Sequence, residues 1–209
     1  MAQYFSVHPV TPQRRLIRQS ADIVRGGGVI VYPTDSCYAL GCGIGQKEAA
    51  ERIRRIRGLD ADHHLTLVCR DLSQLAHFAR VDNAQFRLLK AATPGGFAFI
   101  LKATREVPRR LQHPRRATIG LRVPDHPVAQ ALLEELGEPL LSSTLMLAGD
   151  DLPPSEPAEV RDRLERQVDL LIDSGACGFE PTTVLDLTGD VPQIVRHGRG
   201  DAAALGLAG

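Results

Sequence analysis

The sequence predicts an α/β protein with a twisted, mixed parallel and antiparallel sheet and helices packed on it. Short apolar runs alternate with amphipathic helical segments through most of the 209 residues, a pattern typical of parallel or mixed sheets. The last three apolar runs have no helix between them, which indicates antiparallel pairing near the end. We find no internal repeat and no linker. The simplest organisation is one domain over residues 1–209, with a core at about 12–200.

The helices are expected from capping residues, apolar stripes and closing glycines. Thr11 before Pro12 is a candidate N-cap for the first helix, which runs to the glycines at 26–28. Asp71, Asp82 and Asp125 are expected to start the third, fourth and fifth helices. The expected helices span about residues 12–25, 46–57, 72–79, 82–92, 125–136 and 159–167.

The strands are expected where apolar residues run together between turn residues. The run at 139–147 carries three adjacent hydroxyl residues, Ser142, Ser143 and Thr144, which need hydrogen-bond partners if the strand is buried. The segments 103–117 and 150–157 contain prolines and are expected to be loops, the second a candidate lid. The expected strands are residues 29–32, 65–69, 97–102, 118–123, 139–147, 168–173, 182–187 and 193–196.

The stretch Gly26–Gly41 is the centre of the prediction. Its apolar run Val29–Tyr32 suits a strand buried on both faces, and a Pro-Thr-Asp-Ser turn follows it. Ligands of open α/β sheets tend to bind just beyond the carboxyl ends of such strands. Thr34, Asp35 and Ser36 are therefore the first candidate site residues. The alternative is an ordinary turn, since these residue types favour turns regardless of function.

The charge distribution is uneven although the formal net charge is zero, with 25 basic and 25 acidic residues. Residues 102–122 contain seven Lys or Arg and one acidic residue, whereas residues 134–173 contain eleven acidic residues and three arginines. A zero net charge gives no general argument for nucleic-acid binding, but this asymmetry indicates one basic face suited to phosphates or an RNA backbone. The alternative is a solvated basic loop.

The cysteines and the N-terminus point to a cytoplasmic protein. The four cysteines lack zinc-finger and Cys-x-x-Cys spacing, so we expect reduced thiols in a reducing compartment. The N-terminus lacks the features of a signal peptide. No apolar run approaches the length of about 18 residues that a membrane span needs, so no membrane partner is expected. His63 and His64 are adjacent and point opposite ways on a strand, so a metal site is not expected.

The sequence lacks the common catalytic motifs and offers instead hydroxyl and arginine residues at strand ends. No P-loop, Gly-x-Gly-x-x-Gly, His-Glu-x-x-His or Gly-x-Ser-x-Gly pattern is present. Arginine and hydroxyl donors suit phosphate and carboxylate groups, and such a site works by positioning and charge neutralisation, as in phosphoryl and nucleotidyl transfer. Each hydroxyl taken singly favours structural hydrogen bonding, whereas the whole set at strand ends favours a site. The set comprises Thr34, Asp35, Ser36, Thr118, Arg122, Ser142, Ser143, Thr144, Thr182, Thr183 and Arg196.

Several of these residues lie in motifs that resemble the YrdC-like family. The segment VYPTDSCYALG at 31–41 is similar to the family's opening motif, and TIGLRVPDHP at 118–127 to its central segment. PLLSSTLMLAG at 139–149, PTTVLD at 181–186 and IVRHG at 194–198 resemble its later motifs in order. The resemblance covers nearly the whole chain. Within the family, the sequence looks most like the YciO branch.

This resemblance implies one α/β domain with a large, basic, concave cavity. It also implies a nucleotidyltransferase that makes L-threonylcarbamoyl-AMP from L-threonine, bicarbonate and ATP, with Mg²⁺ accompanying ATP, for the t6A modification of tRNA. The family has also been described as binding double-stranded RNA, so a tRNA- or double-stranded-RNA-binding module without turnover is the alternative. The implied substrate contacts are Thr34, Asp35, Ser36, Arg57, Arg122, Ser142 and Thr182. The implied nucleotide contacts are His63, Thr118, Thr144 and Arg196.

Two positions depart from the family pattern. The Lys-x-Arg motif appears as Arg57-Gly58-Leu59, and the Ser-x-Asn motif appears as Thr144-Leu145-Met146. Arginine and lysine are not interchangeable at a point-charge site, and leucine offers no hydrogen bond to a phosphate. The fold and a nucleotide-binding cavity therefore follow more directly from the resemblance than the complete synthase reaction does.

Overall fold

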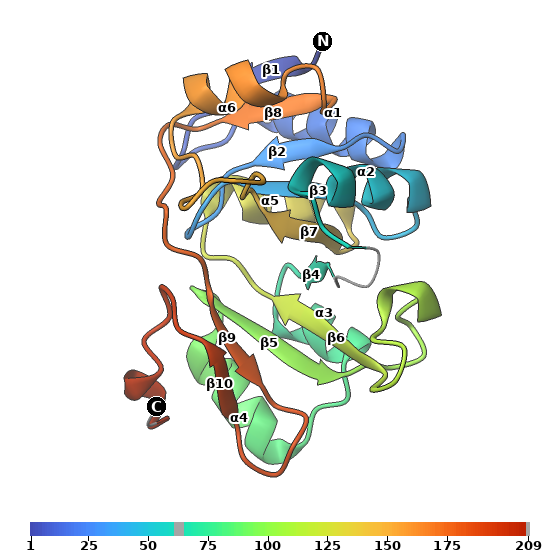
Figure 1. Cartoon of the computed structure of the whole chain (residues 1–209), viewed down its shortest axis with the longest axis vertical. Coiled ribbons are helices and arrows are strands. Elements are labelled where there is room, and N and C mark those ends of the chain that lie inside the picture. Colours follow the sequence, from blue (N-terminus) through green and yellow to red (C-terminus); the bar gives the residue numbers. More distant parts are fainter. Residues whose placement is uncertain (61–64, 208–209) are drawn as a thin grey trace.

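The computed structural model describes residues 1–60 and 65–207. Its described strands form one mixed sheet in the order β1-β8-β2-β3-β7-β4-β6-β5-β9-β10. Figure 1 shows this sheet running the length of the molecule, with β1 at one end and β10 at the other. The predicted α/β class and mixed sheet are confirmed. The strands are β1 (Gln3–Ser6), β2 (Ile30–Tyr32), β3 (Ala39–Gly43), β4 (Thr66–Val68), β5 (Phe97–Lys102), β6 (Thr118–Arg122), β7 (Leu140–Thr144), β8 (Leu170–Asp173), β9 (Thr183–Asp186) and β10 (Gln193–Arg196).

The six helices of the described residues lie close to the six predicted ones. Gly58 ends α2 in the left-handed conformation with φ 63°, and Asp82 caps α4 through a reciprocal capping box with Gln85. Two short 3₁₀ helices, η1 (Arg109–Leu111) and η2 (Ala203–Leu205), are additional. The α-helices are α1 (Arg14–Arg25), α2 (Lys47–Arg57), α3 (Leu72–Phe78), α4 (Asn83–Ala92), α5 (Pro127–Leu136) and α6 (Pro157–Leu164).

Two predicted caps are wrong. Helix α1 begins at Arg14 rather than after Thr11, because the backbone N–H of Thr11 donates to Nδ1 of His8 and its hydroxyl lies 3.0 Å from the same atom. Helix α5 begins after His126 rather than Asp125, because His126 Nδ1 accepts the N–H of Val128. In both cases a histidine ring nitrogen makes the bond to the local backbone.

Strands β1 and β3 were not predicted from the sequence. Strand β3 pairs antiparallel with β2, so residues 33–38 form the turn of a hairpin. Its sequence, ALGCG, contains two glycines and shows no clear alternation. Strand β1 is a short edge strand that pairs in parallel with β8 and is mostly exposed.

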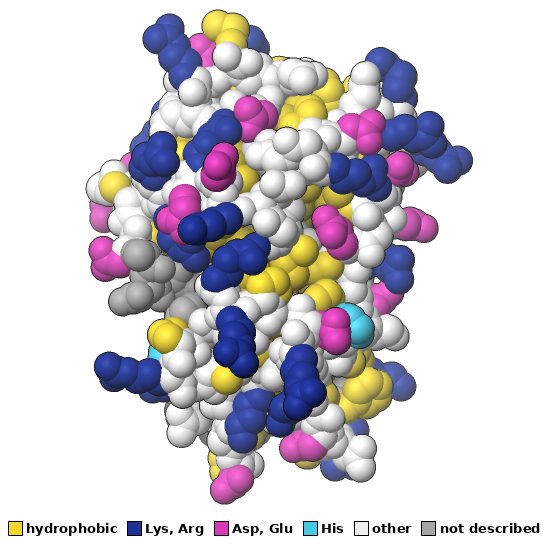
Figure 2. Space-filling view, turned by 90° about the vertical axis from the view of Figure 1, so that its right-hand side faces the viewer, with side chains coloured by type: hydrophobic (Ala, Val, Ile, Leu, Met, Phe, Trp, Pro, Cys, Tyr) yellow, Lys and Arg dark blue, Asp and Glu magenta, His cyan; other side chains and the backbone are white. Residues whose placement is uncertain are grey.

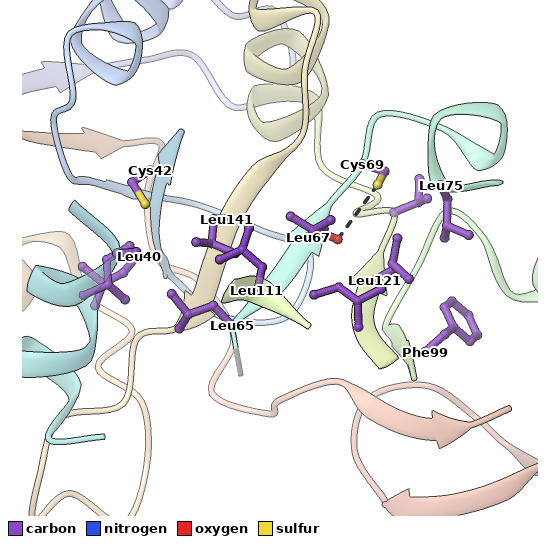
Figure 3. Close-up of a cluster of buried hydrophobic side chains, with 14 of the residues drawn as sticks. Leu40, Cys42, Leu65, Leu67, Cys69, Leu75, Phe99, Leu111, Leu121 and Leu141 are labelled. Atoms are coloured by element: carbon purple, nitrogen blue, oxygen red, sulfur yellow. Dashed lines mark hydrogen bonds between the residues drawn. The ribbon is translucent and has the colours of Figure 1, made fainter. Parts of the chain in front are cut away.

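The hydrophobic core occupies both faces of the sheet. On one face, α1 and α5 cover β8, β2, β3 and part of β7, burying residues such as Ile30, Leu132 and Leu140. On the other face, α2, α3, α4 and α6 pack on a larger cluster that includes Leu40, Leu67 and Phe99; Figure 3 shows part of it. This second layer extends over the strands from β8 to β9, well past the strands that α1 and α5 cover, so the two layers are offset along the sheet.

Candidate functional site

A cavity lies where the α1 and α5 layer ends and the sheet face is left uncovered. Ser142 of β7 pairs with Thr66 of β4, Thr66 pairs with Gly120 of β6, and Gly120 pairs with Ile100 of β5. Paired residues point to the same side of a sheet, so these four form a row across the cavity floor. All four line the cavity. Three of them are small, and this leaves space above the strands.

The cavity has an outer and an inner chamber. The outer chamber has a volume of about 540 Å³ and the inner one about 40 Å³. They share a wall made of Thr66, Ala98, Ser142, Ser143, Thr144 and Thr182. The outer chamber is large enough for a nucleotide-sized ligand, whereas the inner one admits only a group of a few heavy atoms, since one water molecule needs roughly 10–15 Å³ of such space.

Three arginines from distant parts of the chain line the outer chamber. Arg57, at the end of α2, donates through Nε to Ser143 Oγ at 3.0 Å and through Nη1 to the carbonyl of Met146. Arg196 of β10 donates through Nε and Nη2 to the carbonyl of Thr182 at 3.1 and 2.9 Å. Arg116 lies on the loop before β6. No Asp or Glu is among the described residues that line either chamber.

Burial affects two of these cations. It lowers the pKa of Arg57, and the charge of Arg196 lowers that pKa further. Burial likewise lowers the pKa of Arg196. Two positive charges held near each other in a partly desolvated cavity are stabilised by an anion between them. The outer chamber is therefore an anion-binding environment.

The inner chamber is bordered by the β2–β3 turn and by the end of β6. Thr34, Ser36 and Arg122 line it. Arg122 Nη2 donates to Asp35 Oδ1 at 2.6 Å, and the two side chains are only 8% and 9% exposed. The Thr34 hydroxyl donates to the Cys37 carbonyl at 2.6 Å and thereby closes the turn. Asp35 is not among the lining residues.

The polar residues of β7 find partners, as burial requires. Ser142 Oγ lies 2.8 Å from the Tyr32 hydroxyl and donates to the Leu40 carbonyl at 2.8 Å. Burial raises the pKa of Tyr32 to about 12, so its hydroxyl keeps its proton and donates to Ser142. Ser143 accepts the Nε–H of Arg57. Thr144 faces both chambers.

The structure brings most of the predicted site residues together. Arg57, Thr118 and Arg196 line the outer chamber, Thr34, Ser36 and Arg122 line the inner one, and Ser142, Thr144 and Thr182 line both. Asp35 stands behind Arg122. His63 lies outside the described residues.

Arg116, His113 and Thr66 line the outer chamber but were not candidate site residues in the sequence. Arg116 belongs to the basic stretch and His113 to the same loop, but nothing in the sequence indicates which members of a basic loop face inward. Thr66 could have been found from strand alternation, since it is the polar residue of the run LTLVC at 65–69. Met146 lines the outer chamber, whereas Leu59 packs against the core.

The basic stretch at 102–122 divides between the surface and the site. Arg122 is buried, and Arg116 lines the outer chamber although it is largely exposed. The remaining five, Lys102, Arg105, Arg109, Arg110 and Arg115, are exposed. Figure 2 shows Lys and Arg side chains on the side of the molecule that carries α2 and η1.

Within the described part of the chain, no three His, Cys, Asp or Glu side chains converge in a way that could hold a metal ion. None of its helices combines the length and the apolar character needed to cross a membrane. The four cysteines are present as free thiols.

The twisted mixed sheet defines an α/β protein with a cavity lined by arginines, and comparison with known proteins identifies its family. The model of the Sua5, YciO and YrdC proteins, described as "Telomere recombination", matches residues 22–198. The chain belongs to this family, and the resemblance noted from its motifs is confirmed.

Individual members of the family are similar to this chain to different degrees. The uncharacterized protein YciO of Escherichia coli (strain K12) is 60% identical over 96% of this chain and 98% of its own length. Its crystal structure superposes with a TM-score of 0.94 over 97% of this chain and 98% of that one. A threonylcarbamoyl-AMP synthase of Nitrosococcus oceani is 37% identical over 67% of this chain and 75% of its own length. P. abyssi Sua5 complexed with L-threonine is 27% identical, with a TM-score of 0.85 over 93% of this chain and 57% of that longer chain.

Proposed function

We propose that the protein is a nucleotidyltransferase of the threonylcarbamoyl-AMP synthase type. In this reaction, L-threonine, bicarbonate and ATP give threonylcarbamoyl-AMP, pyrophosphate and water. The observation that carries the proposal is the two-chamber cavity, in which three arginines line a nucleotide-sized space and hydroxyl groups line a small one. Synthase relatives and a threonine-bound Sua5 in the same family support the choice of substrates.

The proposed work of the side chains is binding and charge neutralisation. Arg57, Arg116 and Arg196 would hold the phosphates of ATP, and Thr118 and Thr144 would hydrogen-bond to the nucleotide. An oxyacid group of the amino acid, its carboxylate or carbamate, would enter the inner chamber beside Thr34, Ser36 and Arg122. The amine of L-threonine first attacks the carbon of bicarbonate, and loss of water leaves N-carboxythreonine, a carbamate. A carbamate oxygen then attacks the α-phosphorus of ATP, the bond from this phosphorus to the oxygen bridging it to the β-phosphorus breaks, and pyrophosphate leaves with its charge neutralised by the arginines. We propose that Mg²⁺ enters with ATP.

Site variants test this assignment. Arg196→Ala removes a cation from the outer chamber, and Thr34→Ala removes the hydroxyl that closes the turn beside the inner one. We expect both variants to lose turnover while remaining folded. Formation of threonylcarbamoyl-AMP is followed by mass spectrometry, and folding by circular dichroism. Retained product formation in both variants would remove this cavity as the active site.

A second candidate function is the binding of double-stranded RNA or tRNA without turnover. The observation that favours it is the exposed set Lys102, Arg105, Arg109, Arg110 and Arg115, which adjoins Arg116 at the cavity. Binding through phosphate contacts must weaken steeply as salt rises, because counterions are released. An affinity for an RNA duplex that does not change between 50 and 200 mM salt, roughly the range over which such binding is lost, would exclude this surface.

A further inference from the structure

The Asp35 carboxylate lies behind the cavity wall and holds a residue that faces the cavity. Asp35 Oδ1 accepts from Arg122 Nη2 at 2.6 Å and from the backbone N–H of Asp125 at 3.1 Å. It thereby connects the β2–β3 turn to both the end of β6 and the segment leading to α5. Asp35 does not line either chamber, whereas Arg122 lines the inner one.

The Arg122 side chain has donor capacity left over. Its Nη2 is bound to Asp35, and its Nη1 reaches Thr34 Oγ1 only at 3.5 Å. Its Nε is buried and has no hydrogen-bond partner among the described residues. A buried donor without an acceptor is costly, and the Arg122 side chain is 92% buried, since 8% of it is exposed. An acceptor oxygen brought by a ligand would remove this cost.

The size of the inner chamber limits what that ligand group can be. At about 40 Å³, the chamber holds a group the size of about three water molecules, each of which needs roughly 10–15 Å³ of such space, and it has no room for a base or a ribose. A carboxylate or a carbamate has three heavy atoms around its centre and acceptor oxygens that match a guanidinium. Arg122 is the one Lys or Arg among the described residues that line this chamber.

We propose that Asp35 is a positioning residue, which fixes the Arg122 guanidinium so that its free N–H groups receive a small oxyacid group, a carboxylate or carbamate, in the inner chamber. This inference rests on the proposed function for the identity of the substrate. It changes the role of Asp35 from a substrate contact to a support for Arg122. The outer chamber, with Arg57, Arg116 and Arg196, does not depend on Asp35.

The first test observes Arg122 directly and needs no ligand. In the wild-type protein, nitrogen-15 NMR should show slow exchange of the Arg122 Nε–H and hindered rotation of its guanidinium, with the signal assigned by its loss in Arg122→Lys. Asp35→Asn should release this rotation, and Asp35→Glu, which keeps the carboxylate, should restore it at least in part. The matched control is Asp125→Asn, because Asp125 contacts Asp35 through its backbone N–H. Hindered rotation that persists in Asp35→Asn would overturn the positioning role.

The second test separates the two chambers by calorimetry. L-Threonine probes the inner chamber and inorganic tripolyphosphate the outer one. We expect Asp35→Asn to weaken L-threonine binding at least tenfold and to leave tripolyphosphate binding within twofold of wild type, with partial recovery in Asp35→Glu. Equal weakening of both probes, or unchanged L-threonine binding, would overturn the assignment of the inner chamber.

The two tests fail independently. If the wild-type protein binds no L-threonine, the proposed substrate is wrong, and the positioning of Arg122 is still decided by the NMR measurement. If L-threonine binds and Asp35→Asn changes neither its affinity nor the Arg122 signal, the proposed function stands and the positioning role falls.

Discussion

Removing two arginines from the outer chamber should abolish the stabilisation that a polyphosphate gives the protein. Arg57 and Arg196 both line this chamber, and burial lowers the pKa of each guanidinium. A ligand at a concentration of 100 times its dissociation constant stabilises the folded state by about 2.7 kcal/mol. For a protein of this size, that is a rise in melting temperature of roughly 5–11 °C.

The double variant Arg57→Ala/Arg196→Ala loses two hydrogen bonds to a charged group, each worth about 1.5–3 kcal/mol. Affinity should therefore fall by at least roughly 100-fold, which reduces the shift to about 1 °C or less at the same ligand concentration. The assay is differential scanning fluorimetry with inorganic tripolyphosphate, each variant measured against its own ligand-free baseline.

The matched control is Arg105→Ala/Arg109→Ala, which removes the same charge from two exposed positions that do not line the cavity. It should keep the full shift. A shift that survives in the cavity variant, or one that is lost equally in the surface variant, would refute the view that tripolyphosphate binds in the outer chamber.

Three further predictions concern the frame of the site and its pH dependence. Gly178→Ala places a Cβ 2.5 Å from the Ser36 carbonyl oxygen, so it should displace the turn and lower both melting temperature and ligand affinity, whereas Gly45→Ala, with nothing within 4 Å, should leave affinity unchanged. Burial lowers the pKa of His126, so the imidazole binds a proton at a higher pH in the unfolded chain than in the folded one. The free energy of unfolding should therefore fall as pH drops below about 6.5. His126→Asn should remove the part of this fall that is due to His126, as measured by urea titrations at several pH values. The pKa of Asp71 is lowered chiefly by the N–H bond it accepts as the cap of α3, so Asp71→Ala should cost about 1 kcal/mol at pH 7, and its difference from wild type should shrink as pH falls through that lowered pKa.

The sequence was sufficient for elements whose signals are local. The run Val29–Tyr32 is fully buried, and α4 begins at the capping box of Asp82. Strand β5 spans the same six residues in the structure as in the prediction. In each of these, residue type, periodicity and capping agree with the tertiary environment.

Local sequence patterns do not predict strands that depend on partners distant in sequence. Strand β3 is defined by pairing with β2 on one side and with β7, about 100 residues away, on the other. Strand β1 exists because β8 offers an edge. The glycines of β3 weaken its prediction from local pattern. Gly41 is nevertheless required there, because a Cβ at this position would lie 2.9 Å from the Tyr32 ring.

The same limit applies to the site. Motifs indicated which hydroxyl and arginine residues belong together, and most of them line one cavity. The ion pair between Asp35 and Arg122 joins residues 87 apart in sequence, and spacing alone gave no sign of it. The inward direction of Arg116 depends on the path of the loop before β6, which has no regular pattern in the sequence.

The most direct test of the proposed function is pyrophosphate release from ATP by the purified protein, with and without L-threonine and bicarbonate. We predict release that requires both, that is lost in Arg196→Ala, and that shows that Arg57 and the rest of the cavity act without a family-type arginine at Leu59 or asparagine at Met146. Absence of release by folded protein that binds ATP would contradict the synthase proposal and would mean that this branch kept the cavity and changed the chemistry.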